Sequence, residues 1–204
     1  MHPLTFFPHI LLLGYGCIGQ ALTPLLLREL EFSPQQITVI EPDPANAVTA
    51  KNIGLTVILE SITADNYLTH LGRYLSSGDL LINVSVNVSS SALIAWCQSH
   101  QVFYVDTCVE PWEGGYLNQD SNVSSNYALR HQALHQAQPS NTTAVIAHGA
   151  NPGLVSHFVK QGLIELAAIK GIDFTDSWPQ LAAALDVRVI QIAEHDAQSA
   201  EIKL

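Results

Sequence analysis

Residues 10–22 read Ile-Leu-Leu-Leu-Gly-Tyr-Gly-Cys-Ile-Gly-Gln-Ala-Leu, an apolar run that breaks into Gly-x-Gly-x-x-Gly and continues as a helix. In this pattern Gly14 allows a tight turn off the strand, Gly16 has no side chain to block a pyrophosphate, and Gly19 lets the helix pack closely on the strand. The phosphates would lie at the helix N-terminus, where free N–H groups and the macrodipole favour negative charge. The stretch predicts a dinucleotide site formed by Gly14, Gly16, Cys17, Ile18 and Gly19.

Glu41 follows the second predicted strand, residues 36–40, and lies 22 positions after Gly19 (41 − 19 = 22). An acidic residue at about this distance binds the ribose hydroxyls of a dinucleotide. No Lys or Arg lies between Glu41 and Ala50, so a 2′-phosphate would find no cation there and would be repelled by the carboxylate. We therefore predict NAD, rather than NADP, as the cofactor. The simpler interpretation is a Gly turn between a strand and a helix, with Glu41 solvated at a strand end.

The composition argues against several classes of partner. Among 204 residues 8 are basic and 18 acidic, and the formal charge of −10 disfavours nucleic acid or an anionic membrane but suits cationic ligands. The three cysteines, Cys17, Cys97 and Cys108, and the nine histidines show no spacing typical of disulfides or metal sites. The N-terminus has no basic region typical of a signal peptide, and no apolar run reaches the roughly 18 residues of a membrane span. We expect a cytoplasmic protein with reduced cysteines and no metal.

Strand-like and helix-like segments alternate strictly along the first three quarters of the chain. The predicted strands are residues 10–13, 36–40, 55–59, 79–85, 102–106 and 144–148, and the predicted helices are residues 20–31, 66–74, 91–99 and 126–138. Six strands with helical crossovers predict an α/β fold, a doubly wound parallel sheet of the Rossmann type, over residues 1–153. Ligands of such sheets bind outside the carboxyl ends of the strands.

Residues 154–204 predict the start of a second, incomplete domain. Apolar residues at helical spacing indicate helices over residues 154–169 and 178–185, and residues 187–193 read as a strand. A single strand cannot form a stable sheet. It therefore either adds to the first sheet or belongs to a domain that this chain does not complete.

Polar residues follow the later strands, where the nicotinamide of a dinucleotide would lie. They are Asn83, Ser85, Asp106, Thr107, Glu110, His148, Gly149 and Asn151. We predict Asn83, Ser85, Asp106 and Thr107 as cofactor contacts. Residues of these types also cap the helices that follow strands, which is the plainer interpretation.

Glu110 precedes Pro111 and Trp112 in a long connection that also carries Gly114-Gly115-Tyr116. A carboxylate on a stiff turn beside an aromatic ring suits a cationic amine, which Glu110 would pair with and Trp112 would contact by a cation–π interaction. The alternative is a solvated glutamate in a surface loop.

Five motifs resemble bacterial homospermidine synthases, within the saccharopine dehydrogenase-like group. They are Gly-Tyr-Gly-Cys-Ile-Gly at 14–19, Asp-Thr-Cys-Val-Glu-Pro-Trp at 106–112, Ser-Asn-Tyr-Ala-Leu-Arg at 125–130, His-Gly-Ala-Asn-Pro-Gly at 148–153 and Ala-Glu-His-Asp-Ala-Gln at 193–198. The last four are far more specific than the first. The resemblance implies that bound NAD is recycled while putrescine is oxidised to an imine, ammonia leaves, a second amine adds, and the new imine is reduced to homospermidine.

The resemblance also implies roles for individual residues. Glu110, Asn151 and Glu194 would be catalytic, and Glu110, Trp112 and Asn151 would contact the substrate. Family members are more than twice this length, and their later part completes the amine pocket and a homodimer. We therefore expect this chain to be a truncated form that turns over putrescine poorly.

Two further hypotheses remain open. One is a non-catalytic NAD-binding module that lacks its substrate domain. The other is a related saccharopine or carboxyspermidine-type dehydrogenase, which would need an arginine for a carboxylate, and Arg130 and Arg188 are the candidates late in the chain.

Overall fold

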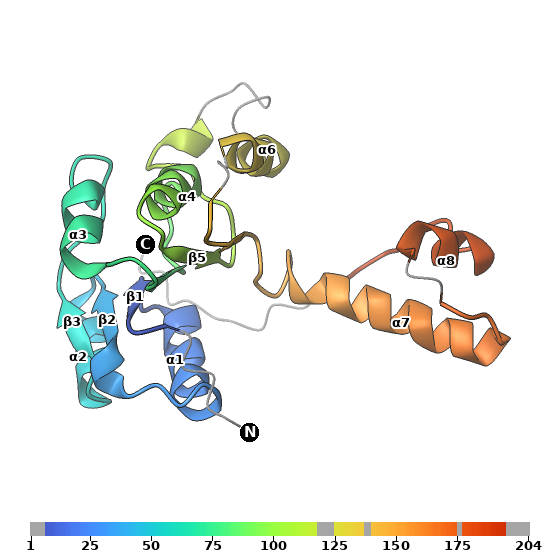
Figure 1. Cartoon of the computed structure of the whole chain (residues 1–204), viewed down its shortest axis with the longest axis horizontal. Coiled ribbons are helices and arrows are strands. Elements are labelled where there is room, and N and C mark those ends of the chain that lie inside the picture. The colour runs from blue at the N-terminus through green and yellow to red at the C-terminus, as the bar shows by residue number, and fades with distance from the viewer. Residues whose placement is uncertain (1–6, 118–124, 137–139, 175–176, 195–204) are drawn as a thin grey trace, which may run out of the picture. The chain divides into compact units, whose positions relative to one another are not determined.

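The computed structural model describes residues 7–117, 125–136, 140–174 and 177–194 (Figure 1). The chain divides into two compact units, residues 1–153 and 154–204, at the boundary that the sequence analysis places between its two regions. What the second unit contributes to a complete protein stays a prediction.

The first unit contains one parallel sheet of six strands in the order β3-β2-β1-β4-β5-β6. The strands are β1 Ile10–Leu13, β2 Ile37–Ile40, β3 Thr56–Ile58, β4 Leu80–Asn83, β5 Phe103–Asp106 and β6 Ala144–Val145. In the central ladder Leu12 is in register with Val39 on one side and with Ile82 on the other. This topology confirms the predicted doubly wound sheet, whose strand order reverses between β1 and β4.

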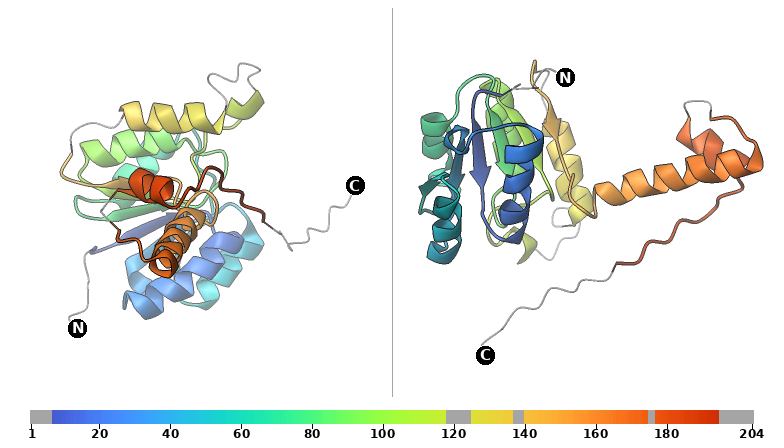
Figure 2. Two further views of the ribbon diagram at one scale, coloured as in Figure 1. Left: turned by 90° about the vertical axis from the view of Figure 1, so that its right-hand side faces the viewer. Right: turned by 90° about the horizontal axis from the view of Figure 1, so that it is seen from below.

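Helices cover both faces of this sheet (Figure 2). They are α1 Cys17–Glu29, α2 Pro44–Asn52, α3 Tyr67–Tyr74, α4 Ser90–Ser99 and α6 Asn126–Gln136. Successive strand residues face opposite sides. Leu12 packs in one buried cluster with residues of α1 and α2, and Leu11 packs in the other with residues of α3, α4 and α6. Each fully buried Leu contributes roughly 1.5–3 kcal/mol, so the four apolar residues of β1 alone anchor both layers.

Several predicted boundaries differ from those observed. Helix α1 begins three residues earlier than predicted (20 − 17 = 3), because Gly16 serves as its N-cap. Helix α2 has no counterpart in the sequence analysis, since only Ala47 and Ala50 mark its buried side. The feature of the sequence that indicates this helix is its N-cap, Asp43 followed by Pro44 at the first helical position. The Asp43 carboxylate accepts a hydrogen bond from the N–H of Ala45 at 2.8 Å.

Strand β6 stops well short of the predicted residue 148. Ala147 has φ +54, and its N–H donates to the buried Asp106 carboxylate at 2.6 Å. This turn diverts the backbone from the ladder after Val145.

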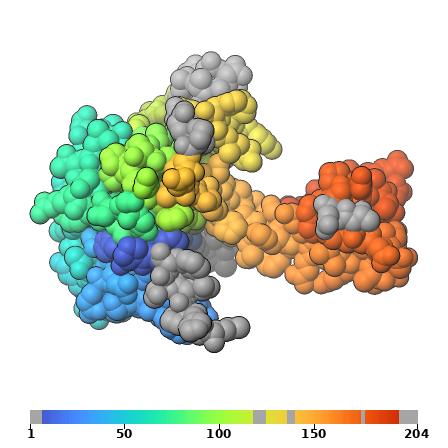
Figure 3. Space-filling view, in the orientation of Figure 1, coloured from blue at the N-terminus to red at the C-terminus, as the bar shows by residue number. Residues whose placement is uncertain are grey.

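The second unit contains α7, Leu154–Lys170, and α8, Trp178–Ala184, whose surfaces pack together (Figure 3). Its buried core consists of Leu163, Ala167, Leu181 and Leu185. The predicted strand over 187–193 is wrong: residues 187–194, all of which the structure describes, form neither helix nor strand. Val189 is 72% exposed and Ile190 51% exposed, because β-branched residues form a strand only where a neighbouring strand accepts their backbone groups. None of the helices within the described ranges is long and apolar enough to cross a bilayer.

Candidate functional site

The three glycines of the first loop meet different surroundings. Gly14 has φ +87, and a Cβ there would lie 3.0 Å from the backbone nitrogen of Ser85. A Cβ on Gly19 would lie 2.8 Å from the carbonyl oxygen of Gly14. A Cβ on Gly16 would meet no described atom within 4 Å. The protein's own packing therefore requires Gly14 and Gly19, while Gly16 borders open space at the N-terminus of α1, where Cys17 and Ile18 are also exposed.

Glu41 holds the glycine loop in place. One carboxylate oxygen accepts a hydrogen bond from the N–H of Tyr15, and the other accepts one from the N–H of Asp43 at 2.8 Å. The side chain amide of Gln20 ties the same loop to α2 through the Tyr15 carbonyl and Asn46, both at 3.0 Å. With Glu41 only 5% exposed, the residue has a loop-supporting role that the sequence analysis missed. Its predicted contact with ribose stays a prediction.

A crevice of about 400 Å³ lies along the carboxyl ends of β1 to β4. Its lining consists of Leu13, Gly14, Ile40, Pro42, residues 60–65, residues 85–88, Trp112 and Glu113. The crevice therefore spans the point where strand order reverses, which is where open α/β sheets bind their ligands.

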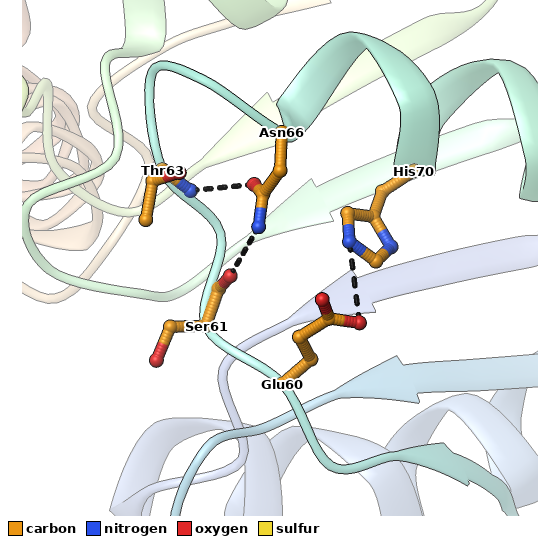
Figure 4. A network of polar contacts seen from close by, with 5 residues as sticks. All are labelled: Glu60, Ser61, Thr63, Asn66 and His70. Atoms are coloured by element: carbon orange, nitrogen blue, oxygen red, sulfur yellow. Dashed lines mark hydrogen bonds and ion pairs between the residues drawn. The ribbon is translucent and has the colours of Figure 1, made fainter.

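The loop after β3 forms one wall of this crevice and is braced from α3 (Figure 4). The side-chain Oδ1 of Asn66 accepts a hydrogen bond from the N–H of Thr63 at 2.8 Å, and its Nδ2 donates to the Ser61 carbonyl at 2.9 Å. The Glu60 carboxylate lies 3.3 Å from Nε2 of the buried His70. No role is predicted above for this loop, although its place directly after a strand is typical of a ligand-binding position.

Two of the predicted cofactor contacts are turned into the protein. Asn83 is 2% exposed and Asp106 fully buried, and the Tyr104 hydroxyl lies between them, accepting from the Asn83 amide at 3.4 Å and donating to the Asp106 carboxylate at 2.8 Å. Burial is the main cause that raises the pKa of Asp106, with the nearby charge of Glu110 adding to it. These hydrogen bonds connect the carboxyl ends of β4 and β5 inside the protein. Ser85, whose hydroxyl donates to Asn83 at 2.6 Å, lines the crevice.

The loop after β6 packs against the end of β5. A Cβ on Gly149 would lie 2.9 Å from the carbonyl oxygen of Thr107, so only glycine allows this approach. His148 and Asn151 are both exposed on the loop, and the bond from Asn151 to Pro152 is cis. Gly149 thus holds this loop against the end of β5, and the predicted cofactor contact of Thr107 and the predicted role of Asn151 stay predictions.

Glu110 is half-buried next to the crevice, and its backbone N–H donates to the hydroxyl of Ser90, the first residue of α4, at 3.1 Å. Its carboxylate accepts a hydrogen bond of 3.5 Å from the N–H of Asn87, a crevice residue, and the nearby Cys108 thiol donates to the Val109 carbonyl at 3.9 Å. Burial first, and then the charge of Glu110, raises the pKa of the Cys108 thiol. Burial and the nearby carboxylate thus keep the Cys108 thiol protonated.

Trp112 and Glu194 lie apart from these contacts. The Trp112 ring packs on Tyr67 with 5.2 Å between ring centroids and lines the crevice beside the loop after β3. Glu194 is exposed in the second unit. Their predicted substrate and catalytic roles stay predictions. Among the described residues no group of three His, Cys, Asp or Glu side chains is placed to hold a metal ion.

The parallel sheet, the glycine loop and the crevice at its reversal point define a nicotinamide dinucleotide-binding domain of the Rossmann type. The model of the saccharopine dehydrogenase NADP binding domain matches residues 10–146. The chain belongs to this family.

Similar proteins narrow this assignment. The homospermidine synthase of Blastochloris viridis is 38% identical over 203 residues, covering 94% of this chain and 43% of its own length. That of Mesorhizobium japonicum is 34% identical, covering 93% and 42%. The crystal structure of the Legionella pneumophila homospermidine synthase in complex with NAD has 36% identity and a TM-score of 0.77, over 86% of this chain and 38% of that one. The resemblance to homospermidine synthases is confirmed, and the chain spans less than half the length of these relatives.

Proposed function

We propose that the chain provides the NAD-binding part of a homospermidine synthase, which transfers the aminobutyl group of putrescine through an imine. The observation that carries the proposal is the Glu110 carboxylate, half-buried and held beside the dinucleotide crevice in a chain related to these enzymes. A cytoplasmic location, in keeping with cysteines whose spacing is not typical of disulfides, and a homodimer belong to the same proposal.

The residues present fit NAD. Gly16 leaves open space before the N-terminal N–H groups of α1, where a pyrophosphate would bind. The described lining of the crevice includes the carboxylates of Glu60, Asp65 and Glu113 and no Lys or Arg. A 2′-phosphate would meet only like charge there, which supports NAD over NADP even though the family's name mentions NADP.

The chemistry assigns separate tasks to cofactor and protein. When bound, NAD would accept a hydride from the amine-bearing carbon and later return it to the new imine. The protein must hold a diamine, which is doubly cationic at pH 7 because aliphatic amines titrate near the lysine value of about 10.4. Glu110 supplies the anion for one ammonium group, the exposed Asn151 amide offers a neutral acceptor, and the aromatic face of Trp112 offers a further cation contact.

Replacing Glu110 with Gln tests the amine site, because it keeps the shape and removes the charge. A charge-assisted contact contributes roughly 1.5–3 kcal/mol, so putrescine binding to the NAD-loaded protein should weaken about ten- to a hundredfold. NAD affinity should be unchanged. Both are measured by isothermal titration calorimetry.

The control is Glu29→Gln, which removes the same charge from an exposed position on α1. A Glu110→Gln variant that binds putrescine as the wild type does would show that Glu110 is an ordinary loop residue. Loss of NAD binding instead would make it a cofactor residue.

The alternative is an NAD-binding module without catalysis. An imine left open to water would hydrolyse before a second amine attacks. We expect slow or no homospermidine formation from putrescine and NAD by these 204 residues. Mass spectrometry of the products measures this rate. Homospermidine formed at an ordinary enzymic rate would rule out the non-catalytic module.

A further inference from the structure

The acidic residue at the end of β2 makes its hydrogen bonds within the protein itself. Oε1 of Glu41 accepts from the N–H of Asp43 at 2.8 Å and from the Asn46 amide at 3.5 Å, while Oε2 accepts from the N–H of Tyr15. Glu41 is 5% exposed, and the described lining of the crevice includes the residues on either side of it but not Glu41. Its carboxylate therefore has little capacity left for a ligand.

Glu60 supplies a second carboxylate at the same place in the sheet. The carbonyl of Ile58, the last residue of β3, accepts hydrogen bonds from the N–H of Glu41 at 3.0 Å and from the N–H of Glu60 at 3.2 Å. The backbones of the two glutamates are therefore neighbours. Unlike Glu41, Glu60 lines the crevice together with Gly14 of the glycine loop, and its side chain is 51% exposed. A ligand in the crevice can reach this carboxylate.

His70 of α3 contacts the Glu60 carboxylate (Figure 4). Nε2 of the imidazole lies 3.3 Å from Oε2 of Glu60. The ring is buried, and it stacks on Tyr74 with 6.2 Å between ring centroids and 16° between the ring planes. A glutamate side chain rotates about several bonds, whereas this ring is held by its packing. The contact with a fixed ring therefore favours one orientation of the Glu60 carboxylate.

The surroundings of His70 indicate that the imidazole does more than fill space. Its Nδ1 is buried and has no hydrogen-bond partner among the described residues. A buried polar atom without a partner costs free energy, so an apolar side chain of similar size would stabilise this position more. The contact with Glu60 is what an imidazole provides here and an apolar side chain does not.

We propose that Glu60, rather than Glu41, is the carboxylate that contacts the adenosine ribose of the cofactor, and that His70 positions it. The inference rests on the proposed NAD-binding function and does not depend on putrescine. The neighbouring 2′- and 3′-hydroxyls of NAD are donors that a carboxylate accepts, whereas the 2′-phosphate of NADP would be repelled. Glu60 then determines the choice between the two cofactors, and Glu41 supports the glycine loop.

The ratio of NAD affinity to NADP affinity tests the role of Glu60. Glu60→Gln keeps the shape of the side chain and removes its charge, so NAD affinity should fall about tenfold and NADP affinity should rise. Glu41→Gln should weaken both cofactors alike, because it disturbs the loop that both would use. Isothermal titration calorimetry with each cofactor measures these affinities. The control is Glu29→Gln, at an exposed position on α1, which should change neither affinity.

Variants of His70 test the positioning role. His70→Leu removes the polar contact together with the unpartnered nitrogen, so NAD affinity should fall about three- to tenfold while the thermal midpoint does not decrease. His70→Gln, whose amide can donate from a position similar to that of Nε2, should restore most of the affinity. In a Glu60→Gln background His70→Leu should have no further effect on NAD affinity, because the carboxylate that it orients is gone.

The outcomes separate this inference from the proposed function. An affinity ratio that is the same in Glu60→Gln and the wild type overturns the role of Glu60, and a ratio that falls in Glu41→Gln instead assigns the ribose contact to Glu41. Effects of His70→Leu and Glu60→Gln that add fully overturn the positioning role. If the wild type binds neither cofactor, the proposed NAD-binding function fails, and the assignment of Glu60 is overturned with it.

Discussion

Gly14 and Gly16 stand two positions apart, yet a methyl group at each would have opposite consequences. At Gly14 it would meet the backbone of Ser85 in a conformation, φ +87, that costs a non-glycine residue roughly 1–2 kcal/mol. At Gly16, where φ is −67, it would project into open space. Gly14 is therefore required by the fold, while the open space at Gly16 is where we propose that the pyrophosphate binds.

Gly16→Val should leave the thermal midpoint unchanged while NAD affinity falls about a hundredfold, since its side chain fills the space of the pyrophosphate. Calorimetric titration and thermal unfolding measure the two effects. Gly14→Ala is the matched variant and should lower the midpoint. NAD binding by Gly16→Val at wild-type affinity would refute a phosphate site at this loop.

The Glu41 carboxylate supports the glycine loop, and its chain neighbours Ile40 and Pro42 line the crevice. The lining itself contains the carboxylates of Glu60, Asp65 and Glu113, so a 2′-phosphate bound in the crevice would meet like charge. We expect the wild type to bind NAD at least about tenfold more tightly than NADP in parallel titrations. Equal affinities, or tighter NADP, would remove the argument from these carboxylates.

One side chain at the start of α3 makes two hydrogen bonds to the loop after β3. Asn66, directly before α3, makes both a donor and an acceptor contact with residues 61–63, which line the crevice (Figure 4). The Thr63 carbonyl of the loop also accepts hydrogen bonds from the N–H groups of Asn66 at 3.3 Å and Tyr67 at 3.1 Å, so the Asn66 amide completes a set of bonds that fix the loop to the start of α3.

Asn66→Ala removes both bonds and should cost about 1–3 kcal/mol locally, because each typical hydrogen bond contributes roughly 0.5–1.5 kcal/mol. NAD affinity should fall about tenfold as the loop loses its fixed shape. Hydrogen exchange of residues 60–66, together with NAD titration, measures both. Asn52→Ala, at the exposed end of α2, is the control, and equal exchange rates in the two variants would contradict the brace.

The whole chain consists of two units with separate cores. The first contains all six strands, the glycine loop and the crevice. It has the buried clusters on both faces of its sheet that a domain needs to fold independently.

A protein that ends at Gly153 should therefore fold and bind NAD within about twofold of the affinity of the whole chain. Circular dichroism establishes folding, and calorimetry measures affinity. A folded 1–153 protein that fails to bind NAD would show that the second unit contributes to the cofactor site.

Local patterns in the sequence determined the parallel sheet, its helices and the glycine loop. The apolar runs at β1 and β4, the spacing of Gly14, Gly16 and Gly19, and the acid at Glu41 act over neighbouring residues, so they are readable along the chain. The specific motifs at 106–112 and 148–153 likewise indicated the family before any coordinate was known.

Contacts between distant residues were decided only by the tertiary structure. The neighbours in space decide whether a polar residue at a strand end faces inward. Asp106 and Ser85 have similar places in the sequence, but Asp106 is buried and accepts a hydrogen bond from the Ala147 N–H, while Ser85 lines the crevice. Residues 187–193 have the composition of a β-strand but do not form one, because a strand requires a neighbouring strand to pair with its backbone. The turn after Trp112 depends on the packing of Gly115 against Pro111, a contact that no periodicity encodes.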